Sequence, residues 1–238
     1  CKIGEVYVGI AGRHISSINS PGMVTVKGGE IGQGDIERVL DSAKTMSIPA
    51  DREVIHIIPQ EYIVDNQRGI ANPIGMAGIR LQVNVHIVTG AVTSVQNIMR
   101  SCHHSQIEVA DIALESLASA KAVLTPEERE IGVALVDIGG GTTDIAIFAN
   151  NSIKYTEVLA LGGQNLSNDI AFGLRTPIAS AEKIKIKYSC AMMDLVHNDE
   201  VILVPSVGGR QPRKISRMAL AQICEPRMDE ILCLVDQS

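Results

Sequence analysis

The sequence contains no tryptophan and has only two phenylalanines and four tyrosines among its 238 residues. Few aromatic faces are offered for base stacking, which argues against binding of single-stranded nucleic acid. The formal net charge of −6 argues against duplex binding as well, because contacts with phosphates need a basic surface. We therefore expect no nucleic acid among the partners of this protein.

Cysteine motifs and long apolar runs are also missing. Five cysteines are widely spaced and none belongs to a C-x-x-C motif, which argues against a disulfide framework and favours a reducing compartment. The pair His103-His104 has no second cluster with ligand spacing, so we interpret it as a solvent-facing helix end rather than a metal site. No run approaches the roughly 20 apolar residues of a membrane span. Because the chain begins at Cys1, within a strand pattern, we expect a fragment.

The hydrophobic residues that are present, 45% of the chain, follow strand and helix periods and indicate an α/β protein. The predicted strands are 5–10, 54–58 (ended by Pro59), 79–87, 133–136, 145–148 and 153–159, with a hairpin turn at Asn150-Asn151. The predicted helices are 36–46 (capped by Asp35), 91–102, 111–124, 164–174 and 177–188. Residues 66–78 are expected to form a loop, and the helical pattern of 220–232 is interrupted at Glu225-Pro226.

The stretch D-I-G-G-G-T-T-D, from Asp137 to Asp144, joins two of these strands. Three successive glycines can expose backbone N–H groups in a concave anion cradle, with two threonine hydroxyls as further donors and Asp137 placed to hold a hydrated Mg²⁺. No G-K-[ST] follows, and a strand rather than a helix comes next, so this is neither a Walker loop nor a dinucleotide fingerprint. A tight hairpin turn is the alternative interpretation.

Three further features favour a ligand site. Gly162 and Gly163 lie at a strand-to-helix joint, where glycine permits close approach to a ligand. Glu182 and Lys185 lie on one helix face and could reach a ribose or purine, although an exposed surface pair is the simpler interpretation. Glu115 lies in the apolar stretch A-L-E-S-L-A-S-A, where a buried carboxylate needs a partner or a function.

These motifs resemble a known superfamily. D-I-G-G-G-T-T-D, L-G-G and A-E-K-I-K are similar to the phosphate-2 and adenosine-side elements of the actin, sugar kinase and heat-shock chaperone ATPases. H-I-I-P-Q-E-Y, N-P-I-G-M, V-P-S-V-G-G-R-Q-P-R and E-P-R resemble, within that superfamily, the FtsA family of bacterial cell-division proteins. The resemblance covers essentially the whole chain.

The resemblance implies an actin-like two-lobed ATPase fold with an FtsA-type 1C subdomain. The implied domains are 1–10 (end of the first lobe, 1A), 11–89 (1C, of the SHS2 type), 90–119 (1A helices) and 120–238 (second lobe, 2A, with an outer subdomain 2B over about 170–233). The family's first phosphate hairpin is expected before Cys1, and its C-terminal part after Ser238.

The resemblance also implies which residues bind Mg-ATP. The implied set is Asp137 (also the metal ligand), Gly139, Gly140, Gly141, Thr142, Thr143, Gly162, Gly163, Glu182 and Lys185. Glu115 falls where relatives that hydrolyse ATP carry a residue that orients the attacking water. Its neighbour Ser116 replaces a proline common in those relatives, so a slow ATPase at most is expected.

Several partners are implied as well. The C-terminal peptide of the tubulin-like protein FtsZ would bind the outer subdomain near Arg210, Arg213 and Arg227. Arg210, Arg213, Lys214 and Arg217 form a local basic cluster, for which a solvated helix start is the alternative interpretation. Self-polymerisation and contact with later division proteins would use the 1C-like region. Membrane contact would come only from a C-terminal amphipathic helix absent from this chain, so the expected location is the cytoplasmic face of the inner membrane at the septum.

Two alternatives remain open at this point. A small-molecule kinase of the same superfamily would use a carboxylate to deprotonate a substrate hydroxyl, but a second glycine-rich sugar loop is missing. A chaperone or pilus-assembly ATPase would share the lobes and bind a different peptide.

Overall fold

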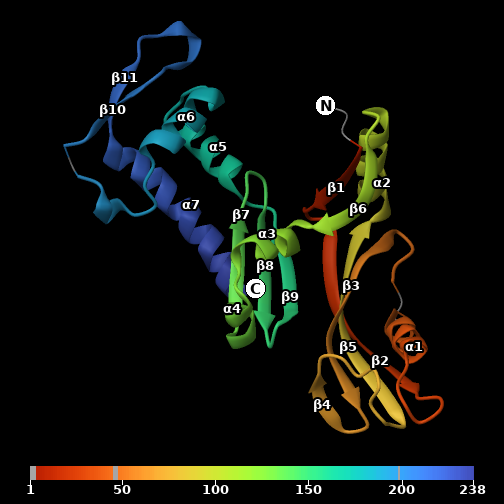
Figure 1. The fold of residues 1–238 in the computed structure, drawn as a ribbon. Coiled ribbons are helices and arrows are strands. Elements are labelled where there is room, and N and C mark those ends of the chain that lie inside the picture. The colour runs from red at the N-terminus through yellow and green to blue at the C-terminus, as the bar shows by residue number, and fades with distance from the viewer. Residues whose placement is uncertain (1–3, 45–47, 198) are drawn as a thin grey trace. The chain divides into compact units, whose positions relative to one another are not determined.

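The computed structural model describes residues 4–44, 48–197 and 199–238. The chain divides into two compact units, one formed by residues 1–137 and 144–158 and the other by 138–143 and 159–238 (Figure 1).

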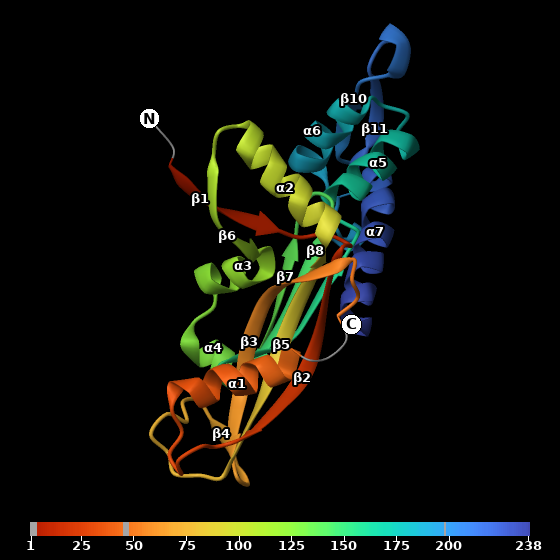
Figure 2. The same ribbon diagram turned by 90° about the vertical axis from the view of Figure 1, so that its right-hand side faces the viewer.

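A four-stranded antiparallel sheet and one helix form the first part of the first unit. The elements are β2 (Ile15–Thr25), α1 (Gln33–Lys44), β3 (Arg52–Val64), β4 (Gln67–Ile70) and β5 (Arg80–Ala91), with strand order β2-β5-β3-β4. Helix α1 crosses one face of the sheet (Figure 2). Its buried Ile36, Val39 and Ala43 share a core with Val83 and Val85 of β5, because alternate strand residues point to one face.

This sheet differs from the sequence-based expectation in three places. β2 was not predicted, because its Ser, Asn, Pro and Gly residues are poor strand formers. β3 continues through Pro59, which lies where its register against β5 shifts, a place that tolerates the missing N–H. β4 occupies part of the predicted loop 66–78.

The opposite, polar face of the sheet meets β9 (Ser152–Leu159). The His86 side chain, 1% exposed, contacts Asn19 Oδ1 through Nδ1 (2.7 Å) and Thr156 Oγ1 through Nε2 (2.9 Å). Gln60 Nε2 donates to the carbonyl oxygen of Ile153 (2.7 Å). Burial lowers the pKa of His86 to about 4, so the imidazole is neutral at pH 7 and both ring nitrogens are used in hydrogen bonds.

The rest of the first unit contains β1 (Glu5–Ile10), α2 (Val92–His104), β6 (Glu108–Leu114), α3 (Glu115–Val123), α4 (Pro126–Ile131), β7 (Val133–Ile138) and β8 (Thr143–Ala149). β1 and β6 pair in parallel, and β7, β8 and β9 form a three-stranded sheet. The predicted helix 111–124 is wrong at its start, since Asp111 to Leu114 pair with β1. The predicted hairpin turn is confirmed, because Asn150 and Asn151 both adopt left-handed φ values of 51° and 56°.

The second unit is a small helical layer with a hairpin. Its elements are α5 (Gly163–Gly173), α6 (Ile178–Tyr188), two short 3₁₀ segments (Met193–Leu195 and Val207–Gly209), β10 (Val201–Val204), β11 (Arg213–Ser216) and α7 (Arg217–Gln237). Ile170, Ile184, Ile202 and Leu220 lie in its core. The predicted interruption of the last helix is wrong: α7 runs through Pro226, which is exposed. Water can therefore hydrate the carbonyl that lost its N–H partner. Within the described residues no helix is long and apolar enough to cross a membrane.

The contact between α1 and β2 depends on Gly22. A Cβ at Gly22 would lie 2.3 Å from the carbonyl oxygen of Val39 and 2.9 Å from the amide nitrogen of Ala43. Both atoms belong to the α1 backbone, so no side-chain rotation relieves the overlap. We expect Gly22→Ala to lower the free energy of unfolding by about 2 to 3 kcal/mol, as measured by urea denaturation.

Gly34, in the first turn of α1, provides the matched control. A Cβ there meets nothing within 4 Å, and alanine is the better helix former, so Gly34→Ala should raise stability by about 0.5 kcal/mol. Equal effects of the two substitutions would contradict the proposed packing at Gly22.

Candidate functional site

The glycine loop between β7 and β8 is a tight main-chain turn. The Gly139 N–H donates to the carbonyl oxygen of Thr142 (2.8 Å). The fully buried Thr143 donates its hydroxyl hydrogen to the carbonyl oxygen of Leu161 (2.8 Å). Thr143 therefore fastens the loop to the chain that follows β9, and its hydroxyl hydrogen is already used inside the protein.

The second glycine pair locks directly onto this loop. The N–H groups of Gly163 and Gln164 donate to the carbonyl oxygens of Gly139 (2.9 Å) and Gly140 (2.7 Å). A Cβ at Gly162 would lie 2.6 Å and 2.8 Å from those same two oxygens. Gly162 is thus required by contact with the first loop, and the first N–H groups of α5 are consumed by that contact rather than left for a ligand.

Gly140 and Gly141 differ from Gly162 in their surroundings. Both are exposed, neither adopts a left-handed φ, and a Cβ on either would meet nothing within 4 Å. Their N–H groups donate to no other group in residues 4–44, 48–197 and 199–238. Nothing inside the described protein requires glycine at these two positions, which are exposed in a loop fixed at both ends by hydrogen bonds.

Helix α6 places a carboxylate and an ammonium beside this loop system. Lys185 Nζ lies 2.8 Å from Glu182 Oε2 and donates to the carbonyl oxygen of Gly163 (3.0 Å). The Ser167 hydroxyl also donates to Glu182 Oε2. These bonds from Lys185 and Ser167 lower the pKa of Glu182, so its carboxylate stays ionised. Lys185 is therefore part of the loop system, whereas Lys183 on the same helix is exposed.

Asp137 and Glu115 belong to the first unit, where α3 positions them. Ser119 donates its hydroxyl hydrogen to Asp137 Oδ2 (2.7 Å). Glu115 lies one turn before Ser119 on the same helix face. It is exposed rather than buried, which corrects the expectation for this carboxylate. A Cβ at Gly9 would lie 2.9 Å from Glu115 Cγ, so the glycine in β1 leaves room for this side chain.

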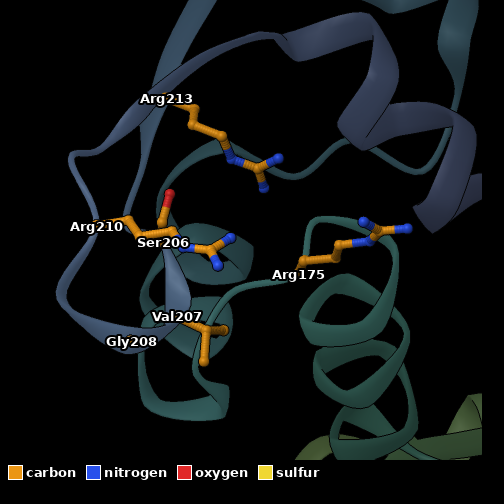
Figure 3. Close-up of a pocket in the computed structure, with 6 residues that line it drawn as sticks. All are labelled: Arg175, Ser206, Val207, Gly208, Arg210 and Arg213. Carbon is orange, nitrogen blue, oxygen red and sulfur yellow. The ribbon is translucent and has the colours of Figure 1, made fainter.

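The three arginines expected to bind a partner do not form one cluster. Arg227, on α7, makes a bidentate ion pair with Asp169 of α5 (2.6 and 3.1 Å) and a second pair with Glu230. Arg210 and Arg213 instead line a pocket together with Arg175, which was not predicted (Figure 3).

Sequence reasoning also missed three polar residues that form hydrogen bonds with predicted site residues. Ser119 and Ser167 are single serines without a motif, although each lies four residues from a site residue on its helix. Asn165 accepts the Gly162 N–H through Oδ1 (3.1 Å). A side chain at this position that returns to the start of its helix is a recognisable capping pattern.

Two solved structures share this fold. The MreB5 protein of Spiroplasma citri bound to ADP matches 62% of this chain and 47% of its own, with a TM-score of 0.50 and 21% identity. The PilM-PilN type IV pilus biogenesis complex matches 77% of this chain and 51% of its own, with a TM-score of 0.55 and 15% identity. The fold therefore belongs to the actin-like class.

The family is narrower than the class. A model described as the SHS2 domain inserted in FtsA matches residues 12–89, and one described as cell division protein FtsA matches 134–233. FtsA of Pseudomonas aeruginosa is 53% identical over 235 residues, and FtsA of Escherichia coli K12 is 42% identical over 237. The chain belongs to the FtsA family of cell-division proteins. The two comparisons cover 99% and 100% of this chain, but the chain spans only 56% of the length of each relative.

The contact at Gly162 leads to a testable difference between two loop glycines. We expect Gly162→Ala to lower the free energy of unfolding of the second unit by about 2 kcal/mol, because the methyl group overlaps two backbone oxygens. Gly140→Ala should change it by less than about 0.5 kcal/mol, since the methyl group enters open space. Thermal unfolding followed by circular dichroism would measure both. If Gly162→Ala were as stable as the parent, the loops would not be locked as described.

Proposed function

We propose that this chain is the nucleotide-binding and partner-binding part of an actin-like adaptor of bacterial cell division. Gly140 and Gly141 carry the proposal. No contact within the described protein requires glycine at these positions, and their N–H groups have no partner among the described residues, although hydrogen bonds hold the loop in place. Close approach of a phosphate would explain both features.

ATP with Mg²⁺ is the ligand that fits. The N–H groups of Gly140 and Gly141 would hold phosphate oxygens. Glu182 Oε1 has no hydrogen-bond partner in the described part of the chain, so it could accept a hydrogen bond from a ribose hydroxyl beside Lys185. Asp137, whose Oδ2 is held by Ser119, offers Oδ1 to a hydrated Mg²⁺, an ion that usually takes one or two carboxylates plus phosphate oxygens. The MreB5 relative was solved with ADP and with AMPPNP, which supports this choice.

Glu115 is our candidate for orienting the attacking water. Its exposed carboxylate is held on the α3 face that also carries Ser119. Hydrolysis is expected to be slow, and nucleotide would act mainly as a switch between conformations that favour or disfavour polymerisation. Such a switch operates only through the difference in nucleotide affinity between the two conformations.

Gly140→Ala tests the nucleotide proposal without disturbing the fold. The added methyl group would occupy the path of the phosphate, so we expect ATP affinity to fall by at least about tenfold, or 1.4 kcal/mol, at unchanged thermal stability. Titration with a fluorescent ATP analogue would measure the affinity, with Glu115→Gln as the matched variant. That variant should keep the affinity and lower any ATP hydrolysis by about 10²-fold. Unchanged affinity in Gly140→Ala would refute the cradle.

The partner proposed for the outer part of the second unit is the C-terminal peptide of FtsZ. Arg227 joins α5 to α7 through its ion pair with Asp169 and keeps a side chain that is 22% exposed, and Arg210 and Arg213 add positive charge on the same unit. Opposite charge speeds association and sets specificity. The SHS2-type region, residues 12–89, would contact neighbouring copies and later division proteins. Attachment to the cytoplasmic face of the inner membrane at the septum is proposed for the whole protein.

Substitutions of Arg227 and of its ion-pair partner Asp169 test whether Arg227 binds the peptide directly. Arg227→Gln should weaken binding of a fluorescent FtsZ C-terminal peptide by at least about tenfold from a dissociation constant on the order of 10 µM. Asp169→Asn breaks the same ion pair but keeps the cation, so it should bind the peptide as well as the parent or better. Fluorescence anisotropy would measure both.

The two variants separate a direct role from a structural one. Equal losses in Arg227→Gln and Asp169→Asn would mean that Arg227 acts only by holding α5 against α7. Lys183→Gln, an exposed cation on α6, should leave binding unchanged.

A further inference from the structure

The pocket beside the β10–β11 hairpin contains Arg210 and Arg213, which the proposed function uses only as added positive charge. We call it the arginine pocket; it has a volume of about 450 Å³ and is lined by Arg175, Ser206, Val207, Gly208, Arg210 and Arg213. Figure 3 shows the guanidinium groups of Arg210 and Arg213 pointing into the same space, with the side chain of Arg175 extending away from them. All six residues belong to the second unit.

Three hydrogen bonds from side chains to the backbone fix the walls of the arginine pocket. The buried Thr176 donates its hydroxyl hydrogen to the carbonyl oxygen of Pro205 (2.7 Å), which ties the hairpin loop to the end of α5. Ser206 donates to the carbonyl oxygen of Gln211 (3.0 Å) and closes the loop on itself. Arg213 donates through Nη2 to the carbonyl oxygen of Leu174, at the negative end of the α5 dipole. The pocket is therefore a formed site rather than the space under a loose loop.

The arginines of this pocket lack carboxylate partners. Arg217 and Arg227, in the same unit, pair with Glu200 and Asp169. Arg175, Arg210 and Arg213 make no ion pair anywhere in the residues that the structure describes. Cations held near one another repel, and this chain is acidic overall. An anion that enters the pocket would offset that repulsion.

The arrangement favours a phosphate group over a carboxylate. One carboxylate carries a single charge, and one guanidinium saturates its two oxygens in a bidentate pair. Arg210 and Arg213 together match the charge of about −1.5 to −2 and the three free oxygens of a phosphate monoester. The volume of about 450 Å³ lies in the range of sites that hold small organic ligands.

We propose that the arginine pocket binds the phosphate group of a small phosphorylated molecule or a lipid headgroup, with Arg210 and Arg213 as its ligands and Arg175 at the rim. This site is distinct from the loop of Gly139 to Gly141 and does not depend on the function proposed for that loop.

Inorganic phosphate is the first probe. Isothermal titration in phosphate-free buffer would be done on the whole chain carrying Gly140→Ala, so that the glycine loop contributes little. We expect saturable binding with a dissociation constant on the order of 1 mM, and a loss of at least about tenfold in Arg210→Gln, because one charge-assisted pair is removed. Arg175→Gln should cause a smaller loss, and Lys183→Gln none. Arg213 is left intact because it also holds the end of α5.

A second arm separates the two sources of phosphate. Co-sedimentation with vesicles of phosphatidylglycerol, compared with vesicles of phosphatidylcholine, should depend on Arg210 if the ligand is a lipid headgroup. Binding of inorganic phosphate without vesicle binding would assign a soluble ligand. Phosphate binding that is unaffected by Arg210→Gln would overturn the proposal. The proposal would also be overturned if Arg210→Gln lost binding of an acidic peptide but kept binding of phosphate, since the pocket would then be a peptide site.

Discussion

The close approach of Gly162 to two carbonyl oxygens is the contact on which the candidate site depends. It brings the start of α5 against the glycine loop, where Gly163 and Gln164 donate to the carbonyl oxygens of Gly139 and Gly140. A side chain at position 162 would separate the two segments. Because α5 gives its first N–H groups to the loop, its N-terminus is not the anion site, and the N–H groups of Gly140 and Gly141 take that role in the proposed mechanism. Lys185 strengthens the same joint from α6 through the carbonyl oxygen of Gly163.

Much of this joint could be predicted from sequence, since glycines between apolar strands are rare enough to indicate a close contact. The different roles of these glycines could not be predicted. A Cβ at Gly162 would overlap the protein backbone, whereas a Cβ at Gly140 or Gly141 would meet nothing within 4 Å, and only the tertiary structure distinguishes the two cases. Ser119 and Ser167 escaped prediction because a serine becomes informative only when its acceptor is known. In the fold, β2 and the first residues of helix 111–124 were missed because pairing with a neighbouring strand outweighed local propensity.

The positions of the charged residues could be read from the sequence, but their ion-pair partners could not be predicted. Arg210 and Arg213 belong to a basic stretch of the chain and Arg227 follows it, yet Arg227 is neutralised by Asp169, 58 residues earlier. Arg210 and Arg213 find no such partner in the described residues and line a pocket with Arg175 instead. Ion pairs between distant segments depend on the packing of α5 against α7, which hydrophobic spacing predicts only as two separate helices. The chemistry of a basic cluster is therefore decided by tertiary contacts that its local sequence does not contain.

Helix α5 connects these features physically. It begins at Gly163, bonded to the glycine loop, passes Asp169, bonded to Arg227, and ends beside Leu174, bonded to Arg213. Eleven residues of α-helix span about 16 Å and move as a rigid rod. A ligand that shifts the glycine loop must either carry α5 with it or break two backbone hydrogen bonds. If α5 moves, the ion pair with Arg227 and the wall of the arginine pocket move as well. Movement of α5 alone could therefore couple a bound nucleotide to the outer surface of this unit, because this helix contacts the glycine loop, Arg227 and Arg213.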